Sequence, residues 1–470
     1  MTTDENAAQA LAPQLAAAVI GLRFGDIPES VRSTAKTHLL DALGLALAST
    51  GMDYGHAVHQ AATRLGAGDE SRVLGFGTPL PAASAALANG TLIHGLDFDD
   101  THIGAIYHPT APALAAALAV GDAERADGES FLLAYIIGLE VGCRIAAAGA
   151  GKFHARGFHP TGIAGTFAAA CVAAKLRGAS AETLTNALGL CGSQAAGILE
   201  LHESWLKRMH PGWAAHSGII AVTLAEAGFR GPATVFEGAG GLFASHLGET
   251  VDAQALGLHD LGARWMTLDI ALKPYPCCHF THAFADAALA LLDELGSDRI
   301  SPEQIDHIDC PIAPALIPLV AEPHERKIAP TTIYDALFSV QYVVASVLAG
   351  RSVDLTTFYD LPLDEPLTLA IANKIRCIPD SNTDFPAHFS GAVTAHLTDG
   401  RVLHHAITDS LGTSQNPLSD TAVITKFLDN TRRAIPESRG PHLIKLVDEL
   451  ENLDDISALL AAAVIPTPPH

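Results

Sequence analysis

The chain has 470 residues, of which 49% are hydrophobic and only 17% charged, so it can bury a large core and most of it is expected to be folded. Its 51 acidic residues against 28 basic ones give a formal net charge of −23, which excludes nucleic acid and anionic membranes as partners. The seven cysteines are odd in number and lack C-x-x-C spacing, which favours a reducing, cytoplasmic location.

Neither the N-terminal residues nor the longest apolar run indicates export or membrane insertion. The first residues, Met-Thr-Thr-Asp-Glu-Asn, are acidic where a secretory signal would be basic. The apolar run at residues 163–174 is too short to cross a bilayer, which takes about 20 residues. We therefore expect a soluble cytoplasmic protein with no membrane partner.

The chain up to about residue 265 predicts a succession of helices, because apolar residues recur with a period near 3.6 between glycine-containing breaks. Helices are predicted over residues 31–49, 112–121, 161–176, 181–199 and 214–227. A high alanine content with few aromatic residues is typical of closely packed helices.

The pattern changes near Lys273, where short β-like stretches begin. Strands are predicted over residues 304–312, 374–378, 392–397 and 402–407, and a helix over residues 331–349. The last two strands flank Asp399-Gly400, which is typical of a tight hairpin turn. Helical periodicity returns from about residue 418 to residue 460.

These elements predict a mainly α fold with a discontinuous domain. A large all-helical domain is expected from residues 1–268 together with residues 409–470. A smaller α+β domain, residues 269–408, is expected between the two helical parts.

Three His-Pro dipeptides, His108-Pro109, His159-Pro160 and His210-Pro211, each precede a run of small apolar residues. Proline is favoured at the first position of a helix, so each pair predicts a helix start, with Thr161 as an N-cap after His159. Unpaired N–H groups and the helix dipole attract anions there, so an adjacent imidazole is a suitable partner for a carboxylate. We expect the three histidines to form one site.

An acidic cluster, His94-Gly-Leu-Asp97-Phe-Asp99-Asp100-Thr101-His102, comes before the first His-Pro pair. Carboxylates with imidazoles suit a divalent metal, but aspartates also cap helix N-termini, and we favour capping and predict no metal. Closely spaced carboxylates repel one another, which makes this cluster a candidate for acid or base chemistry.

In so acidic a chain, lysines beside histidines are informative about anion binding. Lys207 lies three residues before His210. The segment Lys273-Pro-Tyr-Pro-Cys277-Cys278-His279-Phe-Thr-His282 presents basic and nucleophilic side chains on a turn stiffened by two prolines. It could supply a Cys-His nucleophile or a zinc site, and zinc is disfavoured because adjacent cysteines fit tetrahedral coordination poorly.

These motifs, in this order, resemble the MmgE/PrpD family, which includes aconitate decarboxylases, 2-methylcitrate dehydratases and an iminodisuccinate epimerase. The resemblance rests on His94-Gly-Leu-Asp-Phe-Asp-Asp-Thr101, His108-Pro-Thr, Gly157-Phe-His-Pro-Thr-Gly162, Lys207 to His216 and Lys273 to His282, and it extends over nearly the whole chain. It implies a helical domain with an inserted α+β lid domain, a homodimer, and an active site between the domains that uses no organic cofactor.

The resemblance also implies which residues serve the reaction. The catalytic residues would be His159, Asp97, Thr101, His108, Lys207 and Lys273, and the substrate-binding residues Cys278, His279, His282 and His210. We expect Lys207, Lys273 and His108 to bind substrate carboxylates. His159 and Asp97 would transfer protons, and Thr101 would orient a carboxylate or a leaving hydroxyl.

The expected function is a cofactor-independent lyase that acts on a di- or tricarboxylate, by decarboxylation as for cis-aconitate or by dehydration as for 2-methylcitrate. Two departures keep an epimerase of an amino or imino dicarboxylate, such as iminodisuccinate, as an alternative. The decarboxylases resemble this chain except for a histidine at the position of Cys278, and the Thr101 to His108 interval is one residue longer here. The epimerase pattern has cysteine at the Cys278 position and histidine at that of His282. A metal-dependent hydrolase and a non-catalytic binding protein are the alternatives from other classes.

Overall fold

The computed structural model describes residues 10–201 and 204–465. Its contacts divide the chain into two compact units, which are Met1–Ile270 with Ser419–His470 (unit 1) and Ala271–Leu418 (unit 2). Helices account for 57% of the structure, which confirms the prediction of a mainly α chain.

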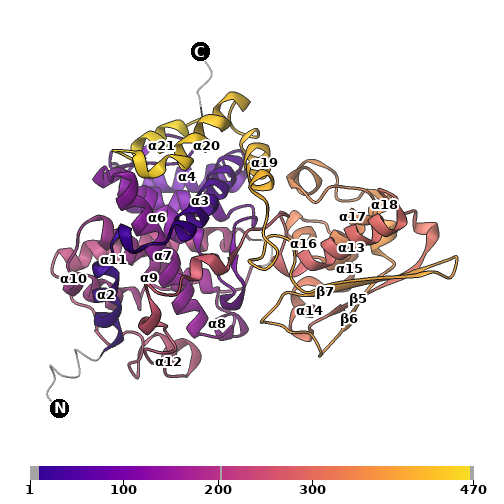
Figure 1. The fold of residues 1–470 in the computed structure, drawn as a ribbon, viewed down its shortest axis with the longest axis horizontal. Helices are drawn as coiled ribbons and strands as arrows, with labels where there is room; N and C mark the ends of the chain where they lie inside the picture. The colour runs from indigo at the N-terminus through magenta and orange to yellow at the C-terminus, as the bar shows by residue number, and fades with distance from the viewer. Residues whose placement is uncertain (1–9, 202–203, 466–470) are drawn as a thin grey trace. The chain divides into compact units, whose positions relative to one another are not determined.

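Unit 1 consists of helices and a few very short strands (Figure 1). Its helices are α2 (Leu11–Gly21), α3 (Glu29–Ser49), α4 (Asp53–Leu65), α5 (Ala82–His94), α6 (Thr110–Glu124), α7 (Gly128–Ala148), α8 (Lys152–Ala155), α9 (Pro160–Leu176), α10 (Ala181–Cys191), α11 (Leu206–Glu226), α12 (Leu242–Leu247), α19 (Asp420–Thr431), α20 (Gly440–Asp448) and α21 (Ser457–Ala462). Its strands are β1 (Ser71–Arg72), β2 (Pro79–Leu80), β3 (Thr101–His102) and Ile270 of β4 (Ile270–Ala271).

The centre of unit 1 is formed by α5, α6, α7, α9 and α11, which pack on one another through small residues. Gly90 of α5 faces Gly212 of α11 so closely that a Cβ at position 90 would lie 2.6 Å from the Cα of Gly212. Helix backbones can approach this closely only where both surfaces lack bulky side chains. The abundant alanine and glycine of this region therefore bring α5 and α11 together, and both helices contribute to the site described below.

Helix α7 is long and apolar enough to cross a membrane by length and composition alone, and 89% of its most apolar window is buried inside the structure. It also holds two buried charges, because Arg144 forms an ion pair with Glu140 one turn earlier. The Glu140 carboxylate accepts hydrogen bonds from the backbone N–H groups of Met266 and Thr267. This buried ion pair and its hydrogen bonds therefore connect α7 to the segment around Met266 and Thr267, near the end of the first part of unit 1.

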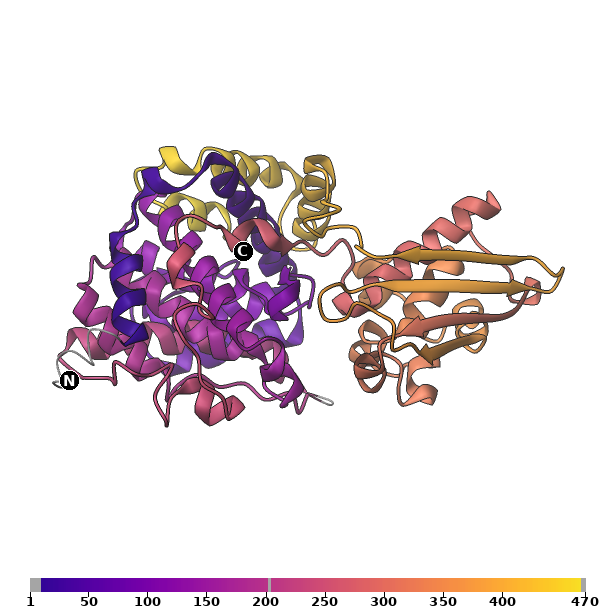
Figure 2. The same ribbon diagram turned by 60° about the horizontal axis from the view of Figure 1, so that its bottom comes forward.

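The second segment of unit 1 packs on the first, since α19 and α20 contact α3. Figure 2 shows these C-terminal helices, in yellow, beside the indigo N-terminal helices. Lys426 of α19 lies 2.8 Å from the buried carboxylate of Asp41 and donates to the carbonyl oxygen of Phe98 at 2.9 Å. Burial raises the pKa of Asp41, while Lys426 opposes that shift.

Unit 2 is an α+β structure built on one four-stranded sheet (Figure 1). The strands are β5 (Ile305–Ile312), β6 (Ile375–Pro379), β7 (Gly391–Leu397) and β8 (Val402–Ile407), in the order β6-β5-β7-β8. Only the β5–β6 pair is parallel, and β7 and β8 form the predicted hairpin, with Gly400 at φ +90° in its turn. The helices are α13 (His282–Leu295), α14 (Ile317–Val320), α15 (His324–Ile328), α16 (Ile333–Leu337), α17 (Val340–Leu348) and α18 (Pro366–Ala372).

Three of the predicted helices are wrong in their extent. The helix predicted to run to residue 199 ends at Cys191. The one predicted over residues 331–349 is two helices, because the side chain of Ser339 starts α17 anew by accepting from the N–H of Tyr342. The helix predicted from residue 214 begins eight residues earlier, at Leu206, and Pro211 lies inside it.

A histidine and carboxylate cluster as the candidate active site

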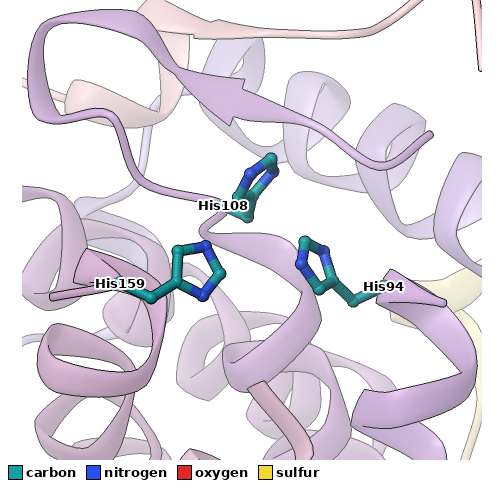
Figure 3. A group of neighbouring side chains, drawn as sticks. All are labelled: His94, His108 and His159. Atoms are coloured by element: carbon teal, nitrogen blue, oxygen red, sulfur yellow. The ribbon is translucent and has the colours of Figure 1, made fainter. Parts of the chain in front are cut away.

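Three histidines from different elements of unit 1 point toward one another (Figure 3). His94 is the last residue of α5, His108 precedes α6, and His159 is the N-cap residue of α9. The ring centres are 4.7 Å apart for His94 and His108, 5.7 Å for His94 and His159, and 5.8 Å for His108 and His159. All three side chains are buried. We call these residues the histidine cluster.

The His-Pro pairs explain how two of these histidines are positioned. Pro160 is the first residue of α9 and fixes the helix start directly after His159, as predicted. The prediction for His210 is wrong, because α11 already runs through His210 and Pro211. The prediction for Thr161 is wrong as well, since its hydroxyl does not cap α9 but accepts a hydrogen bond from the backbone N–H of His108 at 3.1 Å. This bond connects the two His-Pro segments.

His210 contacts the cluster from α11 despite its different setting. Its Nδ1 lies 2.9 Å from Nδ1 of His159, so one of these nitrogens donates and the other accepts. Burial lowers the pKa of His159 well below its usual value and that of His210 to about 4, and the neighbouring imidazoles and Lys207 add to the effect. Both rings are therefore neutral at pH 7, and Nε2 of His159 is the nitrogen left for a bound molecule.

Two carboxyl-bearing residues set the orientation of the other two rings. Asp99 accepts from Nδ1 of His94 at 2.8 Å, and the carbonyl oxygen of Asp100 accepts from Nδ1 of His108 at 2.8 Å. Because a carboxylate or carbonyl oxygen only accepts, each Nδ1 carries the proton. Nε2 of His94 is buried and has no hydrogen-bond partner within residues 10–201 and 204–465. Thr101 also contacts this cluster, since its Oγ1 lies 3.5 Å from Nδ1 of His108.

An ion pair supplies the charge next to this cluster. Lys207, in the first turn of α11, donates from Nζ to Oδ2 of Asp97 at 2.7 Å. Asp97 has φ +53°, a left-handed conformation that aspartate adopts more readily than most residues. The next residue of α11, Arg208, donates from Nε to the carbonyl oxygen of Gly95 at 2.7 Å. These two bonds attach the start of α11 to the loop after α5.

Sequence reasoning missed the support beneath the cluster. The buried carboxylate of Asp100 lies 2.8 Å from Nδ1 of His38 and accepts from the hydroxyl of Thr110 at 2.5 Å. Tyr135 of α7 is 2.7 Å from the same Thr110 hydroxyl. The sequence gives little signal for this network, because Thr110 and Tyr135 are isolated polar residues among apolar ones and His38 follows a polar stretch of its helix.

We expect Thr110→Val to destabilise unit 1 without removing any member of the histidine cluster. The substitution leaves Asp100 and Tyr135 each short of one buried hydrogen bond, which costs about 1 to 3 kcal/mol. Urea unfolding followed by circular dichroism measures the loss. The matched control is Thr425→Val on α19, where an exposed hydroxyl bonds to the carbonyl oxygen of Thr421 and the change should stay within about 0.5 kcal/mol. Equal stability of the two variants would contradict the supporting role of Thr110.

Four of the predicted residues lie in unit 2, in the segment that leads to the start of α13. Lys273, Cys278, His279 and His282 are all buried, and the rings of His279 and His282 are 4.6 Å apart. Nε2 of His282 lies 3.2 Å from the carbonyl oxygen of Cys277. Unlike the histidine cluster, these cysteines and histidines are not among the groups of described residues that have metal-ligand spacing.

The histidine cluster itself could hold a metal, since ligand nitrogens of His94, His108 and His159 all lie within 4.8 Å of one another. His94, Asp97, Asp99 and His108 form an overlapping set. The same arrangement of imidazoles beside a lysine can equally receive a carboxylate and exchange a proton with it.

Comparison with known proteins decides the family. The MmgE/PrpD N-terminal domain matches residues 13–254 and the MmgE/PrpD C-terminal domain matches residues 275–452. The chain belongs to the MmgE/PrpD family. It is 28% identical to human cis-aconitate decarboxylase over 98% of this chain and 96% of the human protein. It is 26% identical to Aspergillus terreus cis-aconitate decarboxylase over 98% of this chain and 97% of that protein. It is 27% identical to the cis-aconitate decarboxylase-like protein oryM of Aspergillus oryzae, over 94% of this chain and 95% of that protein.

For this MmgE/PrpD protein we expect the His159–His210 pair to make stability depend on pH. The pKa of His210 is about 4 in the folded chain and about 6.5 when unfolded, so the unfolded state binds more protons between these values. The free energy of unfolding should therefore fall as the pH drops from about 6.5 to about 4, by up to about 3 kcal/mol from this group. Urea unfolding of wild type and His210→Gln at several pH values measures it. A variant with the wild-type pH dependence would contradict the prediction.

Proposed function

We propose that the chain is a lyase that acts on a di- or tricarboxylate, and that decarboxylation of cis-aconitate is its reaction. The observation that carries this proposal is the histidine cluster, in which burial keeps the imidazole of His159 neutral by lowering its pKa, beside the Lys207–Asp97 ion pair. The family and its decarboxylase relatives support an enzyme of the lyase type. Dehydration, as for 2-methylcitrate, uses the same kinds of group and is the nearest variant of this proposal.

Substrate binding follows from the charges of the site. A carboxylate that approaches Lys207 can share its ammonium group with Asp97, and charge-assisted hydrogen bonds are about twice as strong as neutral ones. His108, whose ring is oriented by the hydrogen bond from its Nδ1 to the carbonyl oxygen of Asp100, is proposed as a second contact with the substrate. Lys273, Cys278, His279 and His282 are proposed to bind further substrate carboxylates, on the strength of the family resemblance.

The proton-transfer step is assigned to His159. Its burial keeps the imidazole neutral in the free enzyme, and a bound polyanion beside it favours the protonated form. In decarboxylation the C–C bond breaks, CO2 leaves without the bond's electron pair, and that pair takes a proton from the His159 imidazolium at carbon. Solvent then restores the proton to the imidazole. In dehydration the neutral ring would instead remove a proton next to a carboxylate, and Thr101 would orient the leaving hydroxyl.

A metal-dependent hydrolase is the second candidate, because the histidine cluster has metal-ligand spacing and Asp99 sits behind His94 as a second-shell carboxylate would. Our proposal is that the reaction needs neither a metal nor an organic cofactor. Activity should therefore persist in enzyme stripped by chelator to below about 0.1 metal ion per chain, as measured by elemental analysis. Loss of activity on chelation with recovery on adding back one ion would favour the hydrolase.

The reaction is tested by incubating the chelated enzyme in D2O with cis-aconitate, 2-methylcitrate or iminodisuccinate and following each by proton NMR. Itaconate from cis-aconitate would support the proposal, and methylaconitate from 2-methylcitrate would support its dehydratase variant. Deuterium entering an α-carbon with inversion, without loss of CO2 or water, would establish the epimerase instead. Stabilisation by a ligand with no turnover of any substrate would indicate a binding protein.

A further inference from the structure

A second group of imidazole and carboxylate side chains lies on the sheet of unit 2. It consists of His307 and Asp309 of β5 and His396 of β7, strands that are neighbours in Figure 1, and we call it the strand cluster. His307 lies directly opposite His396 in the antiparallel ladder, and Asp309 follows two residues later. Side chains alternate along a strand, so buried Ile308 and Cys310 point to one face while the strand cluster points to the other.

The three side chains converge at distances that suit coordination. Nε2 of His307 and Nε2 of His396 each lie 3.6 Å from Oδ2 of Asp309. Two bonds of about 2.1 Å at a tetrahedral angle separate their ligand atoms by roughly 3.4 Å, so each distance is close to one edge of a zinc tetrahedron. The two rings are stacked with centres 4.1 Å apart, so one ring has to turn out of the stack for both nitrogens to point at one ion.

A fourth residue fixes the tautomer that coordination requires. Asp306 accepts a hydrogen bond from Nδ1 of His307 at 2.8 Å. The ladder shifts register between Ile305 and His307, which makes Asp306 the extra residue of a bulge and lets it reach the ring beside it. With the proton on Nδ1, the lone pair of His307 is on Nε2 and faces Asp309. Metal-binding histidines are held by second-shell carboxylates in the same way.

One oxygen of the Asp309 carboxylate has no hydrogen-bond donor among the described residues. Oδ1 of Asp309 is buried and accepts no hydrogen bond from the residues that the structure describes. A buried acceptor without a donor is unfavourable, and a bound cation would remove that cost. The side chains of His307 and His396 are 20% and 33% exposed, so an ion can reach the cluster from solvent.

We propose that the strand cluster binds one divalent transition-metal ion of the zinc class, through Nε2 of His307, Nε2 of His396 and the two carboxylate oxygens of Asp309. Two imidazoles with one carboxylate favour Zn²⁺ or Co²⁺ over Mg²⁺ and Ca²⁺, which prefer oxygen ligands. The ion would cross-link β5 to β7 and so stabilise the sheet of unit 2. This site is separate from the histidine cluster and takes no part in the proposed reaction.

The test is a titration of the full-length, tag-free, chelator-treated chain with ZnCl2 by calorimetry and with CoCl2 by visible absorption. His307→Gln and His396→Gln should each reduce the number of bound ions by one or weaken this site at least tenfold. Asp306→Asn should weaken it about ten- to a hundredfold, because it removes only the orienting carboxylate. The matched control is His404→Gln on β8, whose Nδ1 is 2.8 Å from the hydroxyl of Thr394, the residue opposite Asp309. Its binding should equal that of wild type.

A second variant distinguishes metal binding from a damaged sheet. Arg376 of β6 is the register partner of Asp309 and places an exposed positive charge beside the cluster. Arg376→Gln should therefore tighten Zn²⁺ binding, an effect that a structural defect does not produce. The proposal is overturned if wild type binds no ion at the strand cluster, or if His307→Gln and His396→Gln bind as many ions, with the same affinity, as wild type.

Discussion

His159→Gln should lower kcat by about 10² to 10⁴ while KM changes only a few-fold, because proton transfer from a positioned side chain contributes about that much to a rate. Glutamine can still form a hydrogen bond to His210 but cannot carry the proton. The binding groups Lys207 and His108 are untouched by the change. Steady-state kinetics with the substrate identified by NMR measure the effect.

His246→Gln is the matched control for His159→Gln. His246 belongs to α12, its Nδ1 lies 3.0 Å from the carbonyl oxygen of Leu242, and its ring contacts Phe158, the neighbour of His159. It therefore tests the same substitution in the same neighbourhood, and its kcat should remain within about twofold of wild type. Equal activity of the two variants would exclude His159 as the proton-transfer group. A rise in KM without a fall in kcat would reassign His159 to substrate binding.

Lys207→Met should raise KM by about 10- to 100-fold, since hydrogen bonds to charged groups contribute about 1.5 to 3 kcal/mol. A lysine that binds a non-reacting carboxylate does so equally in the ground state and the transition state, so kcat should change much less. The control is Lys152→Met, which removes an equally short ion pair, Lys152 to Glu249 at 2.7 Å, from an exposed site. Unchanged KM and kcat in Lys207→Met would exclude the carboxylate-binding role.

Asp97→Asn separates the two roles open to that residue. If Asp97 only holds Lys207, the variant should alter KM and leave kcat nearly unchanged. If Asp97 transfers a proton, kcat should fall by the same order as in His159→Gln. The ion pair of 2.7 Å makes the first outcome the expected one, because Lys207 already occupies Oδ2 of Asp97.

Much of the fold could be predicted because it depends on local patterns. The hairpin at Asp399-Gly400 and the helix start after His159 follow from turn and proline preferences. Pro211 was misleading for the same reason, since the preceding turn of α11 forms despite it. The early end of α10 and the restart of α17 at Ser339 depend on tertiary contacts and capping that a helical period does not reveal.

The members of the candidate site could be predicted, but their partnerships could not. His94 and Asp99 were recognised only as parts of an acidic cluster, whereas the structure pairs them and turns Nε2 of His94 inward. Thr161 was expected to cap a helix, and it instead binds the backbone of His108, 53 residues away. His38 carries no local signal, because it lies between Lys36-Thr37 and Leu39-Leu40 in the middle of a helix. Contacts between segments that are distant in the chain depend on how the chain folds, and local patterns in a single sequence do not predict them.

The division of unit 1 into two segments has a consequence for how the protein is made. Asp41 on α3 is near the start of the chain, and its partner Lys426 is translated only after the whole of unit 2. At about 5 to 20 residues per second, the ribosome needs on the order of ten seconds or more to synthesise that insert. During this time the face of α3 that α19 later covers is open, and the carboxylate of Asp41 has no cation. A nascent chain that stalls inside unit 2 would therefore expose the apolar surface of an incomplete helical unit to chaperones.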